Sequence, residues 1–164
     1  MKLESLQDLF VHELQDLHNA ETQLVKAIPQ MARAASSPEL KSSFEKHLEE
    51  TRRQVERLEQ VFRELGESPK GKVCMGMKGL IEEGSELIHE NADPAVKDAG
   101  LIVAAQKVEH YEIAGYGSCC VFAETLGYDR IKKLLKETLS EEEATDKKLS
   151  QLAETVINVD AATR

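Results

Sequence analysis

Two acidic residues one helical turn apart interrupt a run of small and apolar residues, KVEHYEIAGYG, at positions 107–117. On a helix the side chains of Glu109 and Glu112 lie on the same face, because residues three apart are neighbours there. A carboxylate on a buried face is costly unless it is protonated, paired with a cation or bound to a metal ion. The pair could therefore ligate a metal if it is buried, whereas an exposed pair on an acidic helix is an ordinary solvated surface.

Similar polar interruptions occur in the apolar stripes of three other long segments. Glu21 falls between Leu17 and Leu24, where the spacing favours an apolar residue. The remaining interruptions lie at mid-length on a predicted inward stripe or at its edge, and they are His47, Glu50, Gln54, Gln106, Glu143 and Asp146. No lysine or arginine shares these stripes, so we predict that a pair of multivalent cations compensates the carboxylates.

The predicted ligands are carboxylates drawn from all four long segments: Glu21, Glu50, Glu109, Glu112, Glu143 and Asp146. Sites rich in carboxylates suit ions such as Fe(II), Fe(III) and Mn(II), so we expect two iron ions, with manganese as the alternative. Further ligands or neighbours of the site are expected among His47, Gln54, Glu142 and Tyr116. Glu142 competes with Glu143 for the inward position, because an error of one residue in helical phase exchanges them.

Several of these residues have an ordinary structural alternative. His47 could ligate a metal, or it could be a histidine at the edge of the core that a neighbouring carboxylate satisfies. Tyr116 could donate a hydrogen bond to a ligand, or it could pack in the core with its hydroxyl toward water. The adjacent Cys119 and Cys120 are expected to be packing residues, because no flanking cation would favour the thiolate there.

Apolar residues at spacings of three and four predict the helices that must position these groups. Ser37–Pro38 and Asp93–Pro94 each combine a capping residue with a proline at the first helical position. Asp129 is expected to cap the last helix. Four long helices are expected over residues 3–33, 38–65, 94–126 and 129–159, and a short one over residues 75–90.

Helices of about 30 residues span about 45 Å. In a chain of 164 residues this length favours near-parallel packing in a bundle over a globin-like arrangement. Short links make the first two and the last two helices antiparallel hairpins, and the link that carries residues 75–90 is long enough to cross the bundle. We therefore expect one domain, residues 1–164, that is an all-α up-and-down four-helix bundle with one long crossover carrying a short fifth helix.

Composition limits the partners and the location of the chain. A net charge of −9 disfavours nucleic acid and anionic membrane surfaces and leaves metal ions as the expected partners. No segment approaches the roughly 18 apolar residues of a membrane span, and the N-terminus has acids where a signal peptide has its apolar stretch. Three cysteines do not form an even disulfide framework. We expect a cytoplasmic protein with reduced cysteines.

The short helix also predicts an assembly. It would place several apolar side chains over one hairpin, namely Met75, Met77, Leu80, Ile81, Leu87 and Ile88. A four-helix core leaves little room to bury them all, so a homodimer with twofold symmetry is expected.

Four phrases make the chain resemble the ferritin-like superfamily and, more closely, the YciF/YciE-type bacterial stress proteins over essentially its whole length. In order they are HNAETQLVKAIPQMARA, HLEETRRQVERLEQVF, LIVAAQKVEHYEIAGYG and LLKETLSEEEATDKKLSQLA. The resemblance implies a ferritin-like, rubrerythrin-like four-helix bundle, often dimeric, with a di-iron site and a role in the stress response. The Glu109-x-x-Glu112 pair resembles the two-carboxylate helix of rubrerythrins.

The chain departs from the usual di-iron pattern on two helices. His47-x-x-Glu50 stands in place of Glu-x-x-His, and Glu143-x-x-Asp146 contains no histidine. A site poor in histidine is expected to hold metal more weakly and to have altered redox chemistry. Two functions follow: a di-metal carboxylate protein that oxidises Fe(II) or consumes peroxide, or a stress-response structural protein that keeps the bundle without a working metal centre.

Overall fold

The computed structural model describes residues 3–164, and every regular element in this range is a helix. The long helices are α1 (Leu6–Ala34), α2 (Pro38–Leu65), α4 (Pro94–Thr125) and α5 (Asp129–Leu152). The link between α2 and α4 contains the shorter α3 (Met75–His89). At its C-terminal end α5 continues through a π-helical turn, η1 (Ala153–Ile157), into α6 (Asn158–Ala161).

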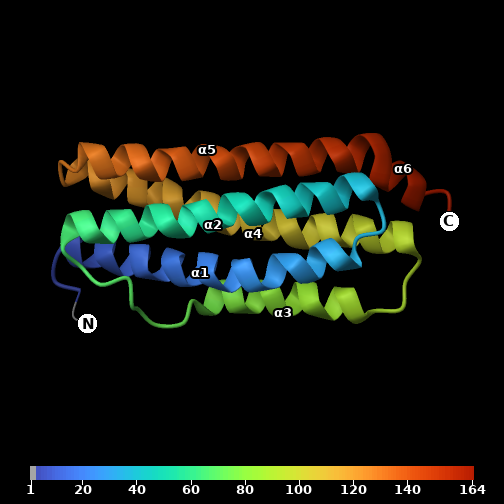
Figure 1. The fold of residues 1–164 in the computed structure, drawn as a ribbon, viewed down its shortest axis with the longest axis horizontal. Helices are drawn as coiled ribbons and strands as arrows, with labels where there is room; N and C mark the ends of the chain where they lie inside the picture. Colours follow the sequence, from blue (N-terminus) through green and yellow to red (C-terminus); the bar gives the residue numbers. More distant parts are fainter. Residues whose placement is uncertain (1–2) are drawn as a thin grey trace.

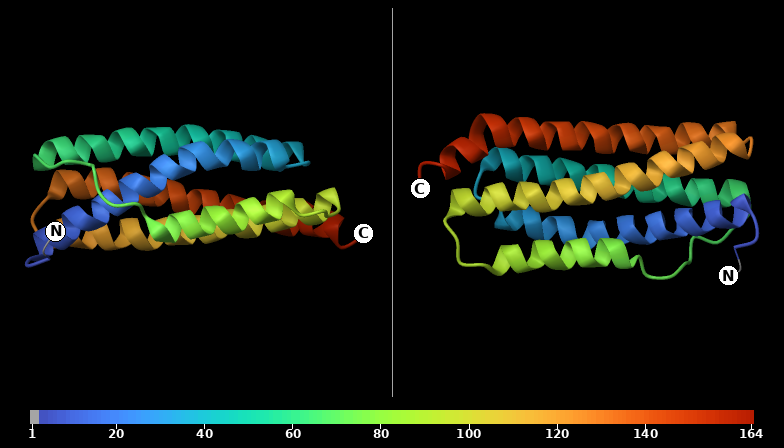
Figure 2. Two further views of the ribbon diagram at one scale, coloured as in Figure 1. Left: turned by 90° about the horizontal axis from the view of Figure 1, so that it is seen from below. Right: turned by 180° about the vertical axis from the view of Figure 1, so that it is seen from behind.

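In chain order, α1 and α5 run in one direction and α2 and α4 in the opposite direction, so that the hairpins α1–α2 and α4–α5 are antiparallel (Figure 1). α1 packs on α2 and α4 packs on α5, while α1 also lies beside α4 and α2 beside α5. The link that contains α3 leads back along the outside of the bundle, over α1 and α4, before α4 begins (Figures 1 and 2). The prediction of an all-α up-and-down bundle with one long crossover and a short fifth helix is therefore confirmed.

Capping side chains begin two of the helices as the sequence predicts. Ser37 and Asp93 accept hydrogen bonds from backbone amides in the first turns of α2 and α4. Gly66, with φ of 69°, ends α2 in the left-handed conformation that glycine adopts without strain. The prediction that Asp129 caps α5 is wrong, because Asp129 is the first helical residue and Tyr128 holds the capping position without a side-chain hydrogen bond.

The apolar core consists of two clusters, one toward each end of the bundle. The cluster near the turn between α1 and α2 includes Leu24, Phe44, Leu101 and Leu149. The cluster at the other end is built around buried residues such as Phe10, Leu14, Phe62, Tyr116 and Leu135. A layer of buried polar side chains on the four long helices separates them, and this layer contains the candidate site.

The apolar face of α3 is partly covered within the chain itself. Met77 is fully buried, and the half-buried side chains that pack against the core with it are Leu80, Ile81, Leu87 and Ile88. Met75 is exposed. Only Met77 of the six residues is buried, although α3 lies against both α1 and α4, which agrees with the expectation that a four-helix core leaves little room to bury them all. The homodimer itself stays a prediction.

The three cysteines are free and buried. Cys74 caps the N-terminus of α3, and its thiol lies 3.0 Å from both a carboxylate oxygen of Asp16 and the hydroxyl of Tyr111. Burial raises the pKa of the Cys119 and Cys120 thiols. Their burial and raised pKa agree with the expectation that they are packing residues rather than reactive thiols.

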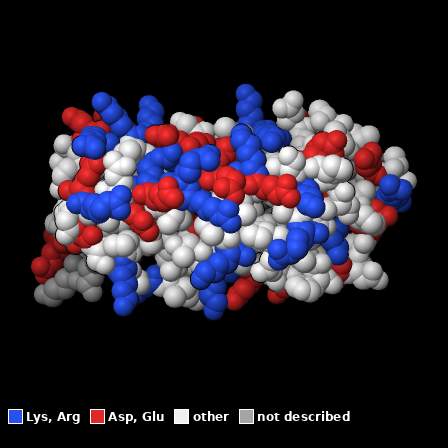
Figure 3. All heavy atoms as spheres, in the orientation of Figure 1, with Lys and Arg blue, Asp and Glu red and all other residues white. Residues whose placement is uncertain are grey.

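The surface carries interspersed charges of both signs, and Figure 3 shows them over the face formed by α2 and α5. In the described residues, no helix is long and apolar enough to span a membrane.

Candidate metal centre

Five ionisable side chains meet at mid-length inside the bundle. Glu21 comes from α1, His47 from α2, Glu109 and Glu112 from α4, and Glu142 from α5. None of the five is more than 5% exposed. A group of ionisable residues this deeply buried is unusual in a soluble domain, because charged side chains are rarely buried without partners.

Helical spacing explains why these residues point inward. Glu109 and Glu112 are one turn apart on α4, between the buried Ala105 and Tyr116. Glu142 follows the buried Thr138 by four residues, which continues the inner stripe of α5. The bundle therefore brings together side chains that are far apart in the sequence.

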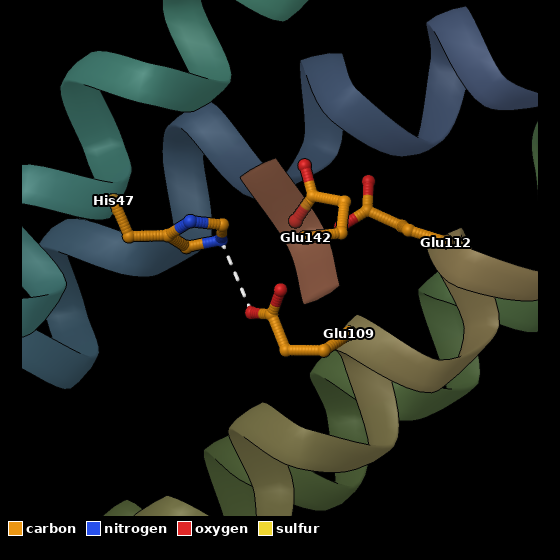
Figure 4. A group of neighbouring side chains, drawn as sticks. All are labelled: His47, Glu109, Glu112 and Glu142. Carbon is orange, nitrogen blue, oxygen red and sulfur yellow. Dashed lines mark ion pairs between the residues drawn. The ribbon is translucent and has the colours of Figure 1, made fainter. Parts of the chain in front are cut away.

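One ligand atom from each of His47, Glu109, Glu112 and Glu142 can be chosen so that all four lie within 4.8 Å of one another. Figure 4 shows the imidazole and the three carboxylates converging from α2, α4 and α5. Nε2 of His47 lies 3.2 Å from Oε1 of Glu109 without a hydrogen bond to it. Nitrogen and carboxylate oxygen at this separation are the atoms that hold transition metals in proteins.

Most of the polar atoms in this cluster have no hydrogen-bond partner. The unpaired atoms are both oxygens of Glu112 and of Glu142, one oxygen each of Glu21 and Glu109, and both ring nitrogens of His47. Buried polar groups normally have partners, and each one left unsatisfied costs about 1–3 kcal/mol. A cation bound between these atoms would satisfy several of them at once, so the residues fit a metal ion.

Glu21 differs from the other carboxylates because one of its oxygens is held. The hydroxyl of Tyr116 donates a hydrogen bond to Oε1 of Glu21 at 2.5 Å, and both side chains are completely buried. The hydroxyl of Tyr116 therefore faces a carboxylate and not water, which was the alternative left open by the sequence. The bond fixes the orientation of Glu21 and leaves its second oxygen free toward the cluster.

Burial sets the protonation of the cluster. It raises the pKa of Glu21, Glu109 and Glu112 well above the usual carboxyl value, and repulsion from neighbouring carboxylates adds to the effect. Burial likewise raises the pKa of Glu142 and lowers the pKa of His47. Without a cation the carboxyl groups therefore tend to keep protons, and metal binding would displace those protons.

A polar network that links α2 to α5 borders the cluster. Gln54 donates to Oε2 of Glu141 at 3.0 Å, and Arg57 donates to the same oxygen at 3.0 Å and to the hydroxyl of Thr138 at 2.6 Å. Burial opposes ionisation of Glu141, but these hydrogen bonds outweigh it and lower its pKa. Arg57 and Glu141 are site neighbours that the sequence pattern does not predict. The one sequence feature that could have indicated Arg57 is its position, one helical turn after Gln54 on α2.

Three of the predicted ligands lie outside the cluster. Glu143 is exposed, so the expectation that it points inward is wrong, and Glu142 takes that position because the inner stripe of α5 continues from Thr138. Asp146 is half-buried and accepts a hydrogen bond from Gln106 at 3.0 Å. Glu50 is half-buried and pairs with Lys46 at 3.2 Å.

A bundle of long helices with one crossover and a buried layer of carboxylates at mid-length is the arrangement of the ferritin-like class. The family model described as "Domain of unknown function (DUF892)" matches residues 5–162, and the chain belongs to this family. The chain is 49% identical over 159 residues to Protein YciF of Escherichia coli (strain K12), and the match covers 96% of each chain.

Solved structures show the same similarity. The crystal structure of the E. coli stress protein YciF superposes with a TM-score of 0.91 at 49% identity, covering 94% of this chain and 98% of the other. YcfI from Rhodopseudomonas palustris, described as a candidate structural protein, gives a TM-score of 0.88 at 44% identity, with 91% and 95% coverage. These matches confirm the predicted resemblance to YciF-type proteins and the fold class.

Proposed function

We propose that this chain is a YciF-type, ferritin-like protein of the bacterial stress response that holds two metal ions, preferably iron, in the buried cluster. One observation carries the proposal: the carboxylates and the imidazole point at one another with most of their polar atoms unpaired. The similarity to a stress protein supports the physiological context.

Charge balance supports two divalent ions over one. Glu21, Glu109, Glu112 and Glu142 carry four negative charges when ionised, and no lysine or arginine is buried among the described residues. Arg57, which borders the cluster, is paired with Glu137 and Glu141. Two divalent cations would neutralise four carboxylates, with His47 bound in its neutral form. Carboxylate-rich ligand sets favour iron or manganese.

Bound iron would supply one-electron chemistry toward O₂ or peroxide, and Fe(II) oxidation or peroxide consumption is the activity that we propose. The chain contributes orientation and exclusion of bulk water. Tyr116 holds Glu21, and the hydrogen bond from Gln54 ties α2 to Glu141 beside the cluster. The apolar clusters on either side of the polar layer leave its acids almost inaccessible to solvent.

The second candidate function is that of a non-catalytic structural or interaction protein. The similarity to YcfI, described as a candidate structural protein, favours it. The cluster also has a single histidine, which predicts weaker metal binding than a site with two or more. The two functions differ in whether metal accompanies the protein and in whether the loaded protein reacts with oxidants.

We also propose that the protein is cytoplasmic, that its partners are metal ions and not nucleic acid, and that it forms a homodimer. Val96, Val103 and Val121 on α4 are 45–58% exposed. They are separated by 7 and 18 residues, so they share one face of the helix. This face is a candidate contact between two copies.

Metal content separates the two candidate functions. Protein purified without added metal should contain iron or manganese when analysed by mass spectrometry, and it should lose that metal when Glu112 is replaced by Gln. Glu143→Gln is the matched control, because Glu143 is an exposed acid on the neighbouring helix. Equal metal content in the parent and in Glu112→Gln would contradict the proposed site.

A further inference from the structure

A surface groove of about 460 Å³ lies between α2 and α5. Lys46 and Glu50 line it from α2, and Glu141, Ala144 and Lys148 line it from α5. It opens along the contact between the two helices that carry His47 and Glu142, on the face formed by α2 and α5 in Figure 3.

The groove is lined by residues that flank the cluster residues along both helices. On α2, Ser43 and Glu50 line the groove four residues before and three residues after His47. On α5, Glu141 immediately precedes Glu142, and Thr145 follows it by three residues. The residues that line the groove and those that form the cluster are therefore next to each other on both helices.

A buried amide lies behind the wall of the groove. Gln54 is fully buried and donates to Glu141, which lines the groove. Its Oε1 atom has no hydrogen-bond partner. A buried residue one hydrogen bond away from the groove wall thus offers an unpaired acceptor oxygen to a cation passing inward.

We propose that this groove is the entrance through which a divalent cation reaches the buried cluster, and that Glu50 receives the cation and passes it toward His47 and Glu142. This inference rests on the proposed metal-binding function. The cluster residues are almost inaccessible to solvent, so a cation needs a path between helices. Carboxylates that line a cleft raise the local concentration of cations and hence their rate of association.

The two carboxylates of the groove have different roles. Glu50 pairs with Lys46, whose side chain is 67% exposed. The ammonium group of Lys46 lies in solvent and binds only weakly, so a divalent cation can take its place beside Glu50, whose own side chain is 15% exposed. Glu141 is held by Arg57 and Gln54 and forms a fixed wall.

Another groove, of about 630 Å³, lies over α3 and α4 and is lined by residues adjacent in sequence to Glu109 and Glu112. Leu80, Val103, Lys107 and His110 are among its lining residues, and no carboxylate is. The groove between α2 and α5 also contains lysines, Lys46 and Lys148, but only this groove offers carboxylates that could receive a cation, so it is the better entrance.

The test measures the rate of Mn(II) uptake separately from the final amount bound. Metal-free protein is mixed with Mn(II) in a stopped-flow instrument, and free Mn(II) is followed with a fluorescent indicator. Glu50→Gln removes the receiving charge and should slow uptake about tenfold without changing the number of ions finally bound. Ala144→Trp fills the groove from an exposed position on α5 and should slow uptake at least as much.

Matched controls separate the groove from general effects. Glu49→Gln removes an exposed acid one residue away on α2, and Ala114→Trp adds the same bulk at an exposed position on α4. Both should take up Mn(II) at the parent rate. Should Ala144→Trp fail to fold, the isosteric Glu50→Gln still decides the outcome.

Parent-like rates in Glu50→Gln and Ala144→Trp would overturn the entrance, as would equal slowing in the controls. A lower end point in Glu50→Gln would make Glu50 a ligand and not a relay. If the parent protein takes up no Mn(II) at all, the proposed function fails and the entrance fails with it. This result can be distinguished from slow uptake, because the amount of Mn(II) finally bound would then be zero.

Discussion

Replacing Glu112 by methionine is predicted to stabilise the metal-free protein and to abolish its stabilisation by metal. Both oxygens of Glu112 are buried without partners, and an unsatisfied buried polar group costs about 1–3 kcal/mol. Methionine has a similar length and favours helices. Removing the two unpaired oxygens should therefore raise the free energy of unfolding by about 2 kcal/mol.

In a domain of this size 1 kcal/mol corresponds to about 2–4 °C in Tm, so chelated Glu112→Met should melt about 4–8 °C above the parent. Metal reverses the order. Each ion at 100 times its Kd adds about 2.7 kcal/mol to the parent, and the variant lacks the ligand needed to gain it. The parent should therefore melt below Glu112→Met without metal and above it with metal. This reversal is expected for a buried carboxylate that destabilises the metal-free fold and binds a cation.

The assay is thermal unfolding followed by circular dichroism, with chelator and with anaerobic Fe(II) or Mn(II). Glu143→Met is the control, because the same change at an exposed position of α5 should leave both melting temperatures near those of the parent. A metal-free Glu112→Met protein less stable than the parent would show that Glu112 is satisfied in the folded chain. An unchanged response to metal would show that Glu112 is not a ligand.

Three further outcomes are expected. The metal-free protein should lose stability as pH rises above the ordinary carboxyl pKa of 4.5, because the raised pKa of Glu21, Glu109 and Glu112 favours the folded state only while they keep their protons; a urea midpoint that rises over this range would contradict it. Tyr116→Phe should cost about 1–3 kcal/mol in urea unfolding, since it leaves Oε1 of Glu21 unpaired, and a neutral effect would mean that the bond is unimportant. Val103→Lys should convert the proposed dimer into a monomer by light scattering, and a monomeric parent protein would refute the dimer itself.

The fold could be predicted because its determinants are local. The apolar stripes, Ser37 and Asp93 as caps and the glycine after α2 lie within a few residues of the features they control. The pair Glu109 and Glu112 could be found for the same reason, because two acids one turn apart interrupt a long apolar run.

The rest of the site depends on distances between helices. Residues 141–143 are three consecutive acids, and a helical step of about 100° per residue decides which of them points inward. Sequence spacing placed Glu143 there, but the packed stripe of α5 places Glu142 there. The hydrogen bonds from Gln54 and Arg57 to Glu141 depend on the register between α2 and α5, and no pattern within either helix encodes it.

The polar layer divides the core into two apolar clusters, and this division has a thermodynamic consequence. Apolar side chains of similar volume in place of the five buried ionisable groups would join the clusters and remove the unpaired atoms, and such replacements are often neutral or stabilising. A bundle that served only as a scaffold would therefore gain stability without the layer. A cation reverses this balance, because it binds the folded chain and adds stability that rises with the ratio of its concentration to its Kd. The polar layer thus lowers the free energy of unfolding unless a cation is bound in it. Measuring how unfolding depends on metal therefore separates a working metal centre from a scaffold.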